Sequence, residues 1–292
     1  MAYNIDQFSK ITGINKLLLR TWENRYNFLT PKRTETKIRI YSDELLILAL
    51  NTKLLLDNGY KISKISKKNN VEIENLITEI STQKTAIESK VSIYINQFIK
   101  SGLKFDTSLF NKTFSDCSSK FSMIDLYKKI MLPTFSKIGL FWLSNKMNPA
   151  QEHFLSEMFK QKIYNQIDNI KNKEKKERWL LFLPPNEYHE LGLLFTRFLL
   201  TYYGFDVIYL GANVPYSSLD QISKSQLISN VLFFSVSNFS KKNIDITCNN
   251  LKNYFPKSNI YLVSNIDDKK NGNLRKINLI KDPDSFIKRI SK

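Results

Sequence analysis

The sequence is poor in the residues that build disulfide frameworks and metal centres. Its 292 residues include only two cysteines, Cys117 and Cys248, and only two histidines, His153 and His189. Two cysteines so far apart indicate neither a disulfide framework nor a cysteine zinc site. The two histidines therefore stand out as positions that need an explanation.

Long apolar runs are also missing. No run approaches the roughly 20 residues that a membrane-spanning helix requires. The N-terminal segment Met-Ala-Tyr-Asn-Ile-Asp lacks the basic-then-apolar pattern of a signal peptide. These absences predict a cytoplasmic protein with no membrane partner. A hydrophobic content of 42% is normal for a globular protein, and the length allows two or three domains, each with its own core.

The net charge of +17 indicates an anionic partner only after a correction for composition. The chain is rich in Lys, Asn and Ile, so a general lysine excess is mostly solvated surface. Arginine is more informative, because its planar guanidinium suits phosphate and guanine. Four of the eight arginines fall in one short window, namely Arg20, Arg25, Arg33 and Arg39. That concentration favours nucleic-acid binding near the N-terminus.

Two short, closely spaced helices are predicted within residues 1–75. Residues 5–13 form a short amphipathic pattern closed by Gly13, and Asn15 can cap a second helix over residues 16–26. Helices joined this tightly form a helix-turn-helix, whose second member enters the major groove of DNA. The predicted core of the second helix consists of Leu18, Leu19 and Trp22.

A basic β-hairpin, or wing, is predicted after Pro31, which breaks the second helix. Ile38 and Ile40 alternate with Arg39 and Tyr41, and the stretch from residue 10 to 40 holds eight basic and two acidic residues. Such a wing suits the phosphate backbone beside the groove. The predicted DNA-contacting residues are Lys16, Arg20, Asn24, Arg25, Lys32, Arg33, Lys37, Arg39 and Tyr41.

This segment resembles the winged helix-turn-helix of MerR-type regulators. The matching residues are Leu19-Arg20-x-Trp22-Glu23-x-Arg25-Tyr26, Pro31-x-Arg33-Thr34, Arg39-x-Tyr41-Ser42 and Gly59-Tyr60-x-Ile62-x-x-Ile65. The chain departs from the family at Thr36-Lys37-Ile38, where a glycine is common at the turn of the wing. The resemblance implies binding to double-stranded DNA as a homo-oligomer, either a dimer or a tetramer. The alternative is a small helical domain with incidental arginines.

A four-helix bundle is predicted over residues 76–172, because no sustained heptad follows Leu76. The expected helices span residues 84–101, 106–118, 121–145 and 148–171. Pro133 should kink the third helix, and Asn148-Pro149 is a favourable start for the fourth.

Trp142 is followed after nine residues by Glu152-His153, which places the tryptophan near the end of one helix and the pair in the first turn of the next. Each residue also has an ordinary explanation: a core tryptophan, a carboxylate favoured by the helix dipole, and a solvated histidine. The pattern resembles the cap of light-sensing, cobalamin-dependent MerR-type repressors (the CarH/LitR group). The resemblance implies that all three cover the upper face of the corrin. Leu143 stands where light sensors of this group can carry a cobalt-capturing histidine.

The C-terminal residues 177–292 predict a doubly wound α/β domain. Strands are expected near residues 179–183, 207–210, 231–235, 260–263 and 277–280, with helices between them and a last helix over 284–290. Strands that alternate with helices in this way form a flavodoxin-like (Rossmann-like) parallel sheet.

The loop after the first of these strands reads Asn186-Glu187-Tyr188-His189-Glu190-Leu191-Gly192. It places His189 beyond the carboxyl edge of the sheet, where open α/β folds bind ligands. Gly192 would let something large approach the backbone. The alternative is a surface histidine near a helix start.

Glu-x-His-x-x-Gly also resembles the motif of cobalamin-binding domains. The resemblance implies that His189 is the lower axial ligand of cobalt, that Glu187 and Gly192 shape its loop, and that Ser235 contacts the buried nucleotide tail. Ser264-Asn265 stands where the family usually has Gly-Gly, and side chains there would narrow the channel for the tail.

Together these features predict a transcriptional repressor rather than an enzyme. It has a winged helix-turn-helix (residues 1–75), a four-helix cap (76–172) and a cobalamin-binding α/β domain (177–292). Adenosylcobalamin, and with it light, is expected to control oligomerisation and operator binding. One alternative is a regulator of the same fold that has lost corrinoid binding and responds to a protein partner. Another is a corrinoid methyl carrier, against which the N-terminal DNA-binding segment argues.

Overall fold

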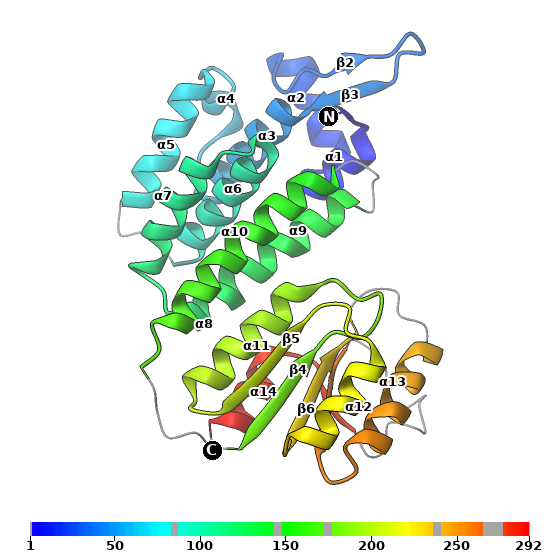
Figure 1. The fold of residues 1–292 in the computed structure, drawn as a ribbon. Coiled ribbons are helices and arrows are strands. Elements are labelled where there is room, and N and C mark those ends of the chain that lie inside the picture. Colours follow the sequence, from blue (N-terminus) through cyan, green and yellow to red (C-terminus); the bar gives the residue numbers. More distant parts are fainter. Residues whose placement is uncertain are drawn as a thin grey trace. The chain divides into compact units, whose positions relative to one another are not determined.

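The computed structural model describes residues 2–82, 87–142, 148–171, 177–235, 241–264 and 277–291. The chain divides into two units, Met1–Glu157 and Met158–Lys292, and the border falls within helix α10 (Pro149–Asp168) (Figure 1). Each unit has its own buried apolar core. Within the described ranges, no helix has the length and apolar character needed to span a lipid bilayer.

The first unit opens with the predicted helix-turn-helix. After β1 (Ala2–Tyr3), α1 (Ile5–Thr12) begins with a capping box formed by Asn4 and Gln7 and ends at Gly13, whose φ is 70°. The second helix, α2 (Lys16–Tyr26), has the predicted bounds, and the side chain of Asn15 accepts a hydrogen bond from the backbone N–H of Leu17 at 2.8 Å. Both helices are therefore set by local caps.

The predicted wing is present as an antiparallel hairpin of β2 (Lys32–Arg33) and β3 (Arg39–Ser42), and β1 pairs with the other edge of β3. Its turn forms without glycine. Lys37 adopts a φ of 61°, a left-handed conformation that costs a non-glycine residue about 1–2 kcal/mol. Backbone hydrogen bonds from Thr34 N to Ile38 O and from Lys37 N to Thr34 O hold the turn closed.

The core of this region corrects one prediction about α2. Leu19 and Trp22 are buried as expected, but Leu18 is 47% exposed. Leu19 and Trp22 are three residues apart and share one face of the helix, whereas Leu18 is turned about 100° from Leu19. The prediction that Leu18 belongs to the core was therefore wrong.

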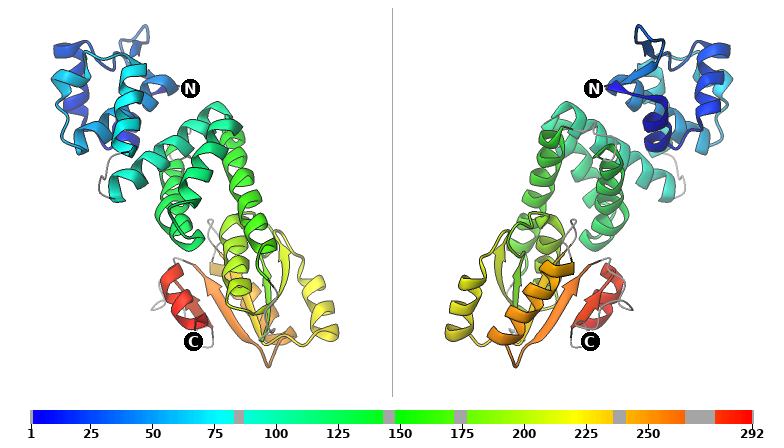
Figure 2. Two further views of the ribbon diagram at one scale, coloured as in Figure 1. Left: turned by 90° about the vertical axis from the view of Figure 1, so that its left-hand side faces the viewer. Right: turned by 90° about the vertical axis from the view of Figure 1, so that its right-hand side faces the viewer.

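The remaining helices of the first unit follow the predicted order. They are α3 (Asp43–Asp57), α4 (Ile62–Ile65), α5 (Asn70–Thr82), α6 (Ile87–Lys104), α7 (Thr107–Ser118), α8 (Met123–Leu126), the π-helical turn η1 (Tyr127–Met131), α9 (Leu132–Trp142) and α10. In Figure 2 the helices from α6 to α10, cyan-green to green, form a helical bundle, which confirms that part of the predicted fold class.

The predicted helix over residues 121–145 is divided by the π-helical turn. Pro133 lacks a backbone N–H, and its ring would clash with the carbonyl four residues earlier in a regular helix. The wider turn lies directly before it, and Leu132 N donates to Tyr127 O, five residues back. Residues 143–147, the predicted end of this helix, lie outside the described part of the chain.

The second unit contains the predicted parallel sheet. Its elements are β4 (Arg178–Phe182), α11 (Glu190–Tyr202), β5 (Asp206–Gly211), α12 (Tyr216–Ser225), β6 (Asn230–Phe234), α13 (Lys241–Tyr254), β7 (Asn259–Val263), β8 (Asn278–Ile280) and α14 (Pro283–Ile290). The strand order β5-β4-β6-β7-β8, with every pair parallel, is the flavodoxin-like order.

Helices cover both faces of this sheet (Figure 1). On one face Leu180, Phe182 and Phe233 pack in a core shared with α12 and α13. On the other face Trp179 meets Phe286 of α14, with ring centroids 5.9 Å apart. The strand order reverses at β4, whose neighbours β5 and β6 lead away in opposite directions. Sheets of this kind bind ligands at the carboxyl end of such a strand.

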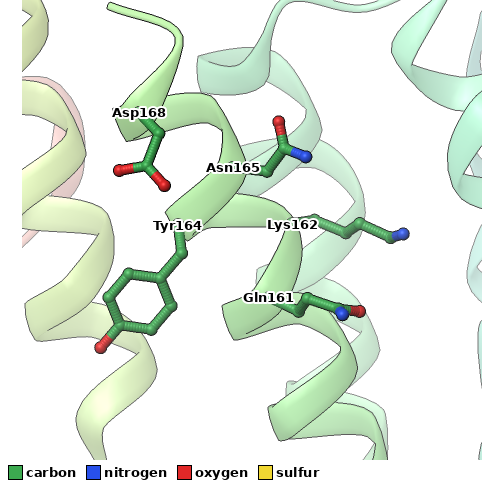
Figure 3. A pocket seen from close by; sticks show the side chains of 5 residues that line it. All are labelled: Gln161, Lys162, Tyr164, Asn165 and Asp168. Atoms are coloured by element: carbon green, nitrogen blue, oxygen red, sulfur yellow. The ribbon is translucent and has the colours of Figure 1, made fainter.

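A surface hollow of about 430 Å³ lies beside α10. Its described lining residues all come from that helix: Gln161, Lys162, Tyr164, Asn165 and Asp168. Lys162 and Tyr164 project to opposite sides of the helix, so the lining side chains do not converge on one point (Figure 3). The hollow includes none of the predicted site residues.

Candidate functional site

Most of the predicted DNA-contacting side chains are at the surface of α2 and the wing. The exposed ones are Lys16, Arg20, Asn24, Arg25, Lys32, Arg33 and Lys37, and Arg39 is partly buried. Lys16 pairs with Asp6 of α1. These residues lie on consecutive elements, so the structure brings the basic groups together on the helix-turn-helix and the wing.

Tyr41 must be removed from that set. It is completely buried, and its ring stacks on Phe8 with centroids 4.1 Å apart. Burial, and next the charge of Glu23, raises the pKa of the Tyr41 hydroxyl. The side chain fills the space between β3 and α1, so the prediction that it contacts DNA was wrong.

Glu23 joins the wing to the recognition helix. Its Oε1 accepts a hydrogen bond from Arg33 and its Oε2 one from Arg39, each at 2.6 Å. Burial alone would raise the pKa of this carboxyl, but the hydrogen bonds from Arg39 and Arg33 hold it below its usual range. One carboxylate thus fixes two arginines of the wing against α2. Sequence reasoning missed this role, because the partners are 10 and 16 residues away.

The histidine loop lies at the carboxyl end of β4, where the strand order reverses. His189 is the N-cap residue of α11, and its side chain is 62% exposed. Glu187 is completely buried, and its Oε1 lies 2.6 Å from Nδ1 of His189. The same oxygen accepts the backbone N–H groups of Tyr188, at 3.0 Å, and of His189, at 3.1 Å. One buried carboxylate therefore fixes both the ring and its loop.

The loop is also held by the segment that follows β5. Asn213 Oδ1 accepts from Asn186 N at 2.9 Å, and Asn213 N donates to the carbonyl of Glu187 at 3.2 Å. Asn186 and Asn213 both have positive φ angles, 67° and 54°, a conformation that asparagine tolerates better than most residues. These hydrogen bonds hold the loop in place without a ligand.

This arrangement determines which ring nitrogen of His189 could bind a metal. When Glu187 is ionised its carboxylate only accepts hydrogen bonds, so Nδ1 of a neutral His189 then donates and Nε2 carries the lone pair. Metal-binding histidines commonly have such a carboxylate on the second nitrogen. Within the described ranges, no three His, Cys, Asp or Glu side chains could hold a metal ion. The exposed ring of His189, held through Nδ1 by Glu187, fits the role of a single protein ligand to the metal of a bound cofactor.

Glu190, the first residue of α11, anchors a second network. Its Oε2 accepts from Lys160 of α10 at 3.0 Å, and its Oε1 accepts from the Tyr209 hydroxyl at 2.9 Å. Burial, and next the charge of Glu190, raises the pKa of Tyr209. The guanidinium of Arg197 lies 5.2 Å from the centre of the Tyr209 ring. Sequence reasoning missed this network, which ties α10 to the start of α11.

The glycine of the motif is explained by a neighbouring side chain. A Cβ at Gly192 would lie 2.8 Å from Cε1 of Phe234, the last residue of β6. The ring of Phe234 therefore fills the space beside the Gly192 backbone. Gly192 was predicted to let something large approach, and in this structure the large group is Phe234.

Ser235 and Ser264 meet at the carboxyl ends of β6 and β7. Both are 5% exposed, and the hydroxyl of Ser264 donates to the carbonyl of Ser235 at 2.9 Å. Ser264 stands where the resembling family has glycine, so a buried hydroxymethyl group occupies space that a glycine would leave open. Asn265 lies outside the described residues.

The predicted cap residues lie at two helix ends. Trp142 ends α9, and α10 begins at Pro149, so Glu152 falls in its first turn. Glu152 accepts a hydrogen bond from Ser156 at 2.9 Å, and His153 is exposed. The side chain of Trp142 and all of Leu143 lie outside the described part of the chain.

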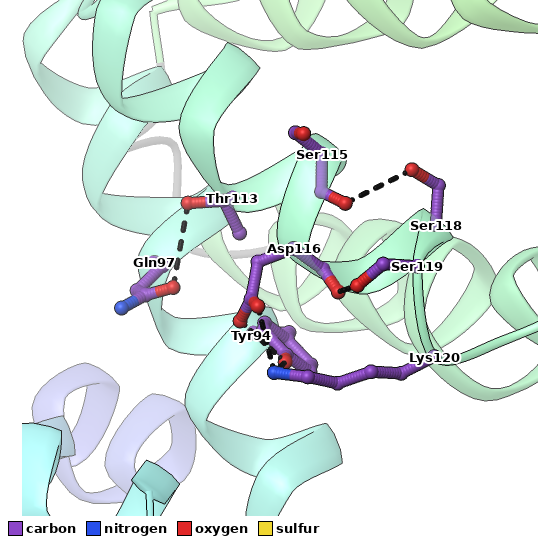
Figure 4. Close-up of polar contacts among 8 residues, drawn as sticks. All are labelled: Tyr94, Gln97, Thr113, Ser115, Asp116, Ser118, Ser119 and Lys120. Carbon is purple, nitrogen blue, oxygen red and sulfur yellow. Dashed lines mark hydrogen bonds and ion pairs between the residues drawn. The ribbon is translucent and has the colours of Figure 1, made fainter.

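A polar cluster on α6 and α7 was not anticipated (Figure 4). The buried Tyr94 donates to Asp116 Oδ2 at 2.6 Å, and Lys120 binds both Asp116, at 2.7 Å, and the Tyr94 oxygen, at 2.8 Å. Burial, followed by the bond to Asp116, raises the pKa of Tyr94 to about 12. The cluster connects two helices of the bundle and contains no predicted site residue.

Two segments of the chain match known protein families. Residues 3–69 match the family described as MerR HTH family regulatory protein, and residues 94–165 match the B12 binding domain family. The second match extends from α6 into α10 and thus covers the helical bundle. Over 258 residues the chain is 23% identical to the HTH-type transcriptional repressor CarH of Myxococcus xanthus, covering 88% of this chain and 86% of that protein.

The repressor CarA of Myxococcus xanthus is also 23% identical, over 220 residues, covering 75% of this chain and 71% of its own length. Among solved structures, the monomethylamine corrinoid protein of Methanosarcina barkeri has a TM-score of 0.52 and 10% identity, covering 68% of this chain and 95% of its own. That likeness shows a shared fold.

These matches define a class: the chain is a MerR-type transcriptional regulator in which a MerR helix-turn-helix is joined to a region of the B12-binding family. Within that class it is homologous to the repressors CarH and CarA. The resemblance drawn from the sequence motifs is thereby confirmed.

Proposed function

We propose that this regulator is a repressor that binds operator DNA as a dimer or tetramer. We also propose that adenosylcobalamin controls its oligomerisation and DNA binding. The observation that carries the proposal is His189, held by the buried Glu187 at the strand-order reversal of a chain that begins with a MerR helix-turn-helix. The proposed division is DNA-binding domain 1–75, cap 76–172 and cobalamin-binding domain 177–292.

The DNA-binding half of the proposal is supported by the placement of basic groups. Arg20 and Asn24 are exposed on α2, which would enter the major groove, and Lys32 and Lys37 are exposed on the wing, beside the phosphates. Replacing Arg20 should relax base preference, because arginine reads guanine. No loss of affinity in an Arg20→Ala/Arg33→Ala double variant would contradict this half.

The corrinoid half is supported by residues that fit an axial ligand and its loop. His189 would ligate cobalt through Nε2, Glu187 would orient the ring, and Ser235 would lie beside the nucleotide tail. Trp142, Glu152 and His153 would contact the upper side of the corrinoid. When bound, adenosylcobalamin supplies a cobalt–carbon bond that light breaks.

Absorbance spectroscopy after incubation with adenosylcobalamin in the dark, followed by removal of free ligand, tests corrinoid binding. The wild type should retain the corrinoid spectrum and His189→Ala should lose most of it. Tyr188→Ala is the matched control, because Tyr188 is the neighbouring residue and is 64% exposed. Equal retention by wild type and His189→Ala would show that the histidine is not the ligand.

Size-exclusion chromatography and DNA binding then test the switch. Loaded protein kept in the dark should elute as a larger assembly than ligand-free protein, and illumination should reverse the change. Leucine at position 143 cannot ligate cobalt, so the illuminated product should be less stable than in relatives with histidine there. Identical elution in all states would contradict the switch.

A second candidate function is favoured by the buried side chain of Ser264, which bonds the Ser235 carbonyl at a position where the resembling family has glycine. In that case the chain is a regulator of the same fold that has lost corrinoid binding and responds to a protein partner. Wild-type protein that retains no corrinoid spectrum, but still binds DNA, would favour this candidate.

A further inference from the structure

The recognition helix α2 exposes two leucine side chains in its first turn. Leu17 is 69% exposed and Leu18 is 47% exposed, although Leu19, the next residue, is fully packed in the core. Exposed leucines are common on protein surfaces, so exposure alone does not indicate a partner. It is their position at the start of α2 that indicates one.

Leu17 lies at the centre of the outward face of α2. Residues 17, 20, 21 and 24 recur at intervals of three and four, so they share one side of the helix, opposite Leu19 and Trp22. The hydroxyl of Thr21 is already bonded to the carbonyl of Leu17 at 2.8 Å. The groups that this face offers are the Leu17 side chain, the Arg20 guanidinium, the Asn24 amide, and the methyl group and hydroxyl lone pairs of Thr21.

Charge complementarity identifies the occupant of this face. Arg20 and Arg25 are exposed on the same helix, and Lys32 and Arg33 on the wing. The stretch from residue 10 to 40 carries eight basic and two acidic residues. A strongly anionic surface suits this setting, and duplex DNA offers one.

The major groove contains one apolar group, the C5-methyl of thymine. The first residues of a recognition helix are those that approach the base edges. Leu17 is the second residue of α2, and Asn24 follows it two turns later on the same face. An asparagine amide matches the N6 and N7 atoms of adenine in the major groove.

We propose that Leu17 packs on a thymine methyl and that Asn24 binds an adenine, so that α2 reads A·T base pairs within the operator. This inference rests on the proposed binding of α2 in the major groove. It adds to that binding the base pairs that are read and the side chains that read them. Leu17 thereby becomes a specificity-determining residue, a role that the sequence did not predict.

Replacing thymine by deoxyuridine tests the contact with single-methyl resolution. Full-length protein, with and without adenosylcobalamin in the dark, first selects preferred duplexes from a randomised library. Each thymine of the selected sequence is then replaced by deoxyuridine, which lacks only the methyl group. The wild type should lose about fourfold in affinity at one position, which corresponds to ~0.8 kcal/mol for one buried methyl-sized group.

The variant Leu17→Ala should bind the thymine and deoxyuridine duplexes equally at that position. Leu18→Ala is the matched control, because Leu18 is also exposed but turned about 100° along the helix, and it should keep the fourfold difference. Asn24→Ala should lose its preference for adenine at one position. Circular dichroism should show unchanged folding, since all three side chains are exposed.

Three results would overturn the inference alone. The first is a wild type that is indifferent to every deoxyuridine, and the second is a Leu17→Ala variant that keeps the full sensitivity. The third is a Leu17→Ala variant that binds all sequences equally weakly, because the leucine would then pack on protein or sugar. Failure to select any duplex would instead contradict the proposed DNA binding, and the inference would fail with it.

Discussion

Nδ1 of His189 lies 2.6 Å from Oε1 of Glu187, a carboxylate with no exposed surface. The same oxygen receives two backbone N–H groups, so the buried charge is compensated by three hydrogen-bond donors around one atom. A histidine with its ring fixed in this way loses little conformational freedom when it binds a metal. We therefore propose that Glu187 acts through His189 as a positioning residue.

Glu187→Gln should weaken corrinoid binding by about tenfold, since carboxylates on the second nitrogen of a ligand histidine affect metal affinity by about 10–100-fold. The amide oxygen can still accept the backbone N–H groups, but the negative charge that makes the imidazole more basic is lost. Titration of corrinoid into protein, followed by absorbance, measures the change. Glu190→Gln is the control, because Glu190 bonds Lys160 and Tyr209. Equal weakening by both variants would contradict the positioning role.

Gly192→Ala should destabilise the second unit by about 1–3 kcal/mol, the usual cost of overpacking a core. The new methyl would lie 2.8 Å from the Phe234 ring. Phe234→Leu should relieve the clash. The double variant should therefore lose less free energy of unfolding than the two single variants lose together. Denaturant unfolding of the four proteins measures the coupling. Strictly additive losses would show that the two residues do not interact.

Much of the fold follows from local signals. The bounds of α2 match the prediction, because Asn15 caps one end and the chain turns before Pro31. The strands were predictable from their short apolar runs, which are buried most completely in the central strands β4 and β6, where the sheet is covered on both faces. The histidine loop followed from its place after the first of these strands.

The errors concern which side of an element faces the core. Three successive leucines, 17 to 19, do not by themselves show which one points inward, and the packing of α2 against α1 decides it. Tyr41 lies on the same face of β3 as Arg39, and the sequence does not show that α1 covers Tyr41 on that face. The contacts of Glu23 with the wing and of Phe234 with Gly192 join residues that are far apart in the sequence, so no local pattern predicts them.

The stability of the N-terminal region should depend on the charge of Glu23. Its pKa is lowered in the folded protein by Arg39 and Arg33, which outweigh its burial. This contribution is therefore present above the unfolded-state pKa of about 4.3 and is lost as the pH falls through the folded-state value. Glu23→Gln should lose about 1–3 kcal/mol at pH 7, and the difference from wild type should shrink in acid. Hydrogen exchange of the α2 amides measures this loss of stability. A difference between wild type and Glu23→Gln that stays constant with pH would contradict the assignment.

Ser264→Gly should increase affinity for cobalamin but not for cobinamide, a corrinoid without the nucleotide tail. The Ser264 side chain is buried against the Ser235 carbonyl, at the edge where the resembling family has glycine. Removing it relieves about 1–2 kcal/mol of overpacking if the tail must pass there, which is about tenfold in affinity. Absorbance titrations with both corrinoids measure the effect. A similar change for both would show that Ser264 acts on the fold rather than on the tail.

Lys32 and Arg33 are adjacent on the wing and exposed. Replacing each of them by alanine should nevertheless have different effects on DNA binding and on the wing. Lys32→Ala should lower affinity for all DNA sequences alike and reduce the slope of log affinity against log salt by about one, because one phosphate contact is removed. Arg33→Ala should also weaken DNA binding, but it removes a 2.6 Å bond to Glu23 and so should loosen the wing on α2. Fluorescence anisotropy at several salt concentrations measures the first effect, and hydrogen exchange of α2 and β3 amides measures the second. An unchanged salt slope in Lys32→Ala would place the wing away from the phosphates. Equal exchange in the two variants would show that Glu23 is held by Arg39 alone.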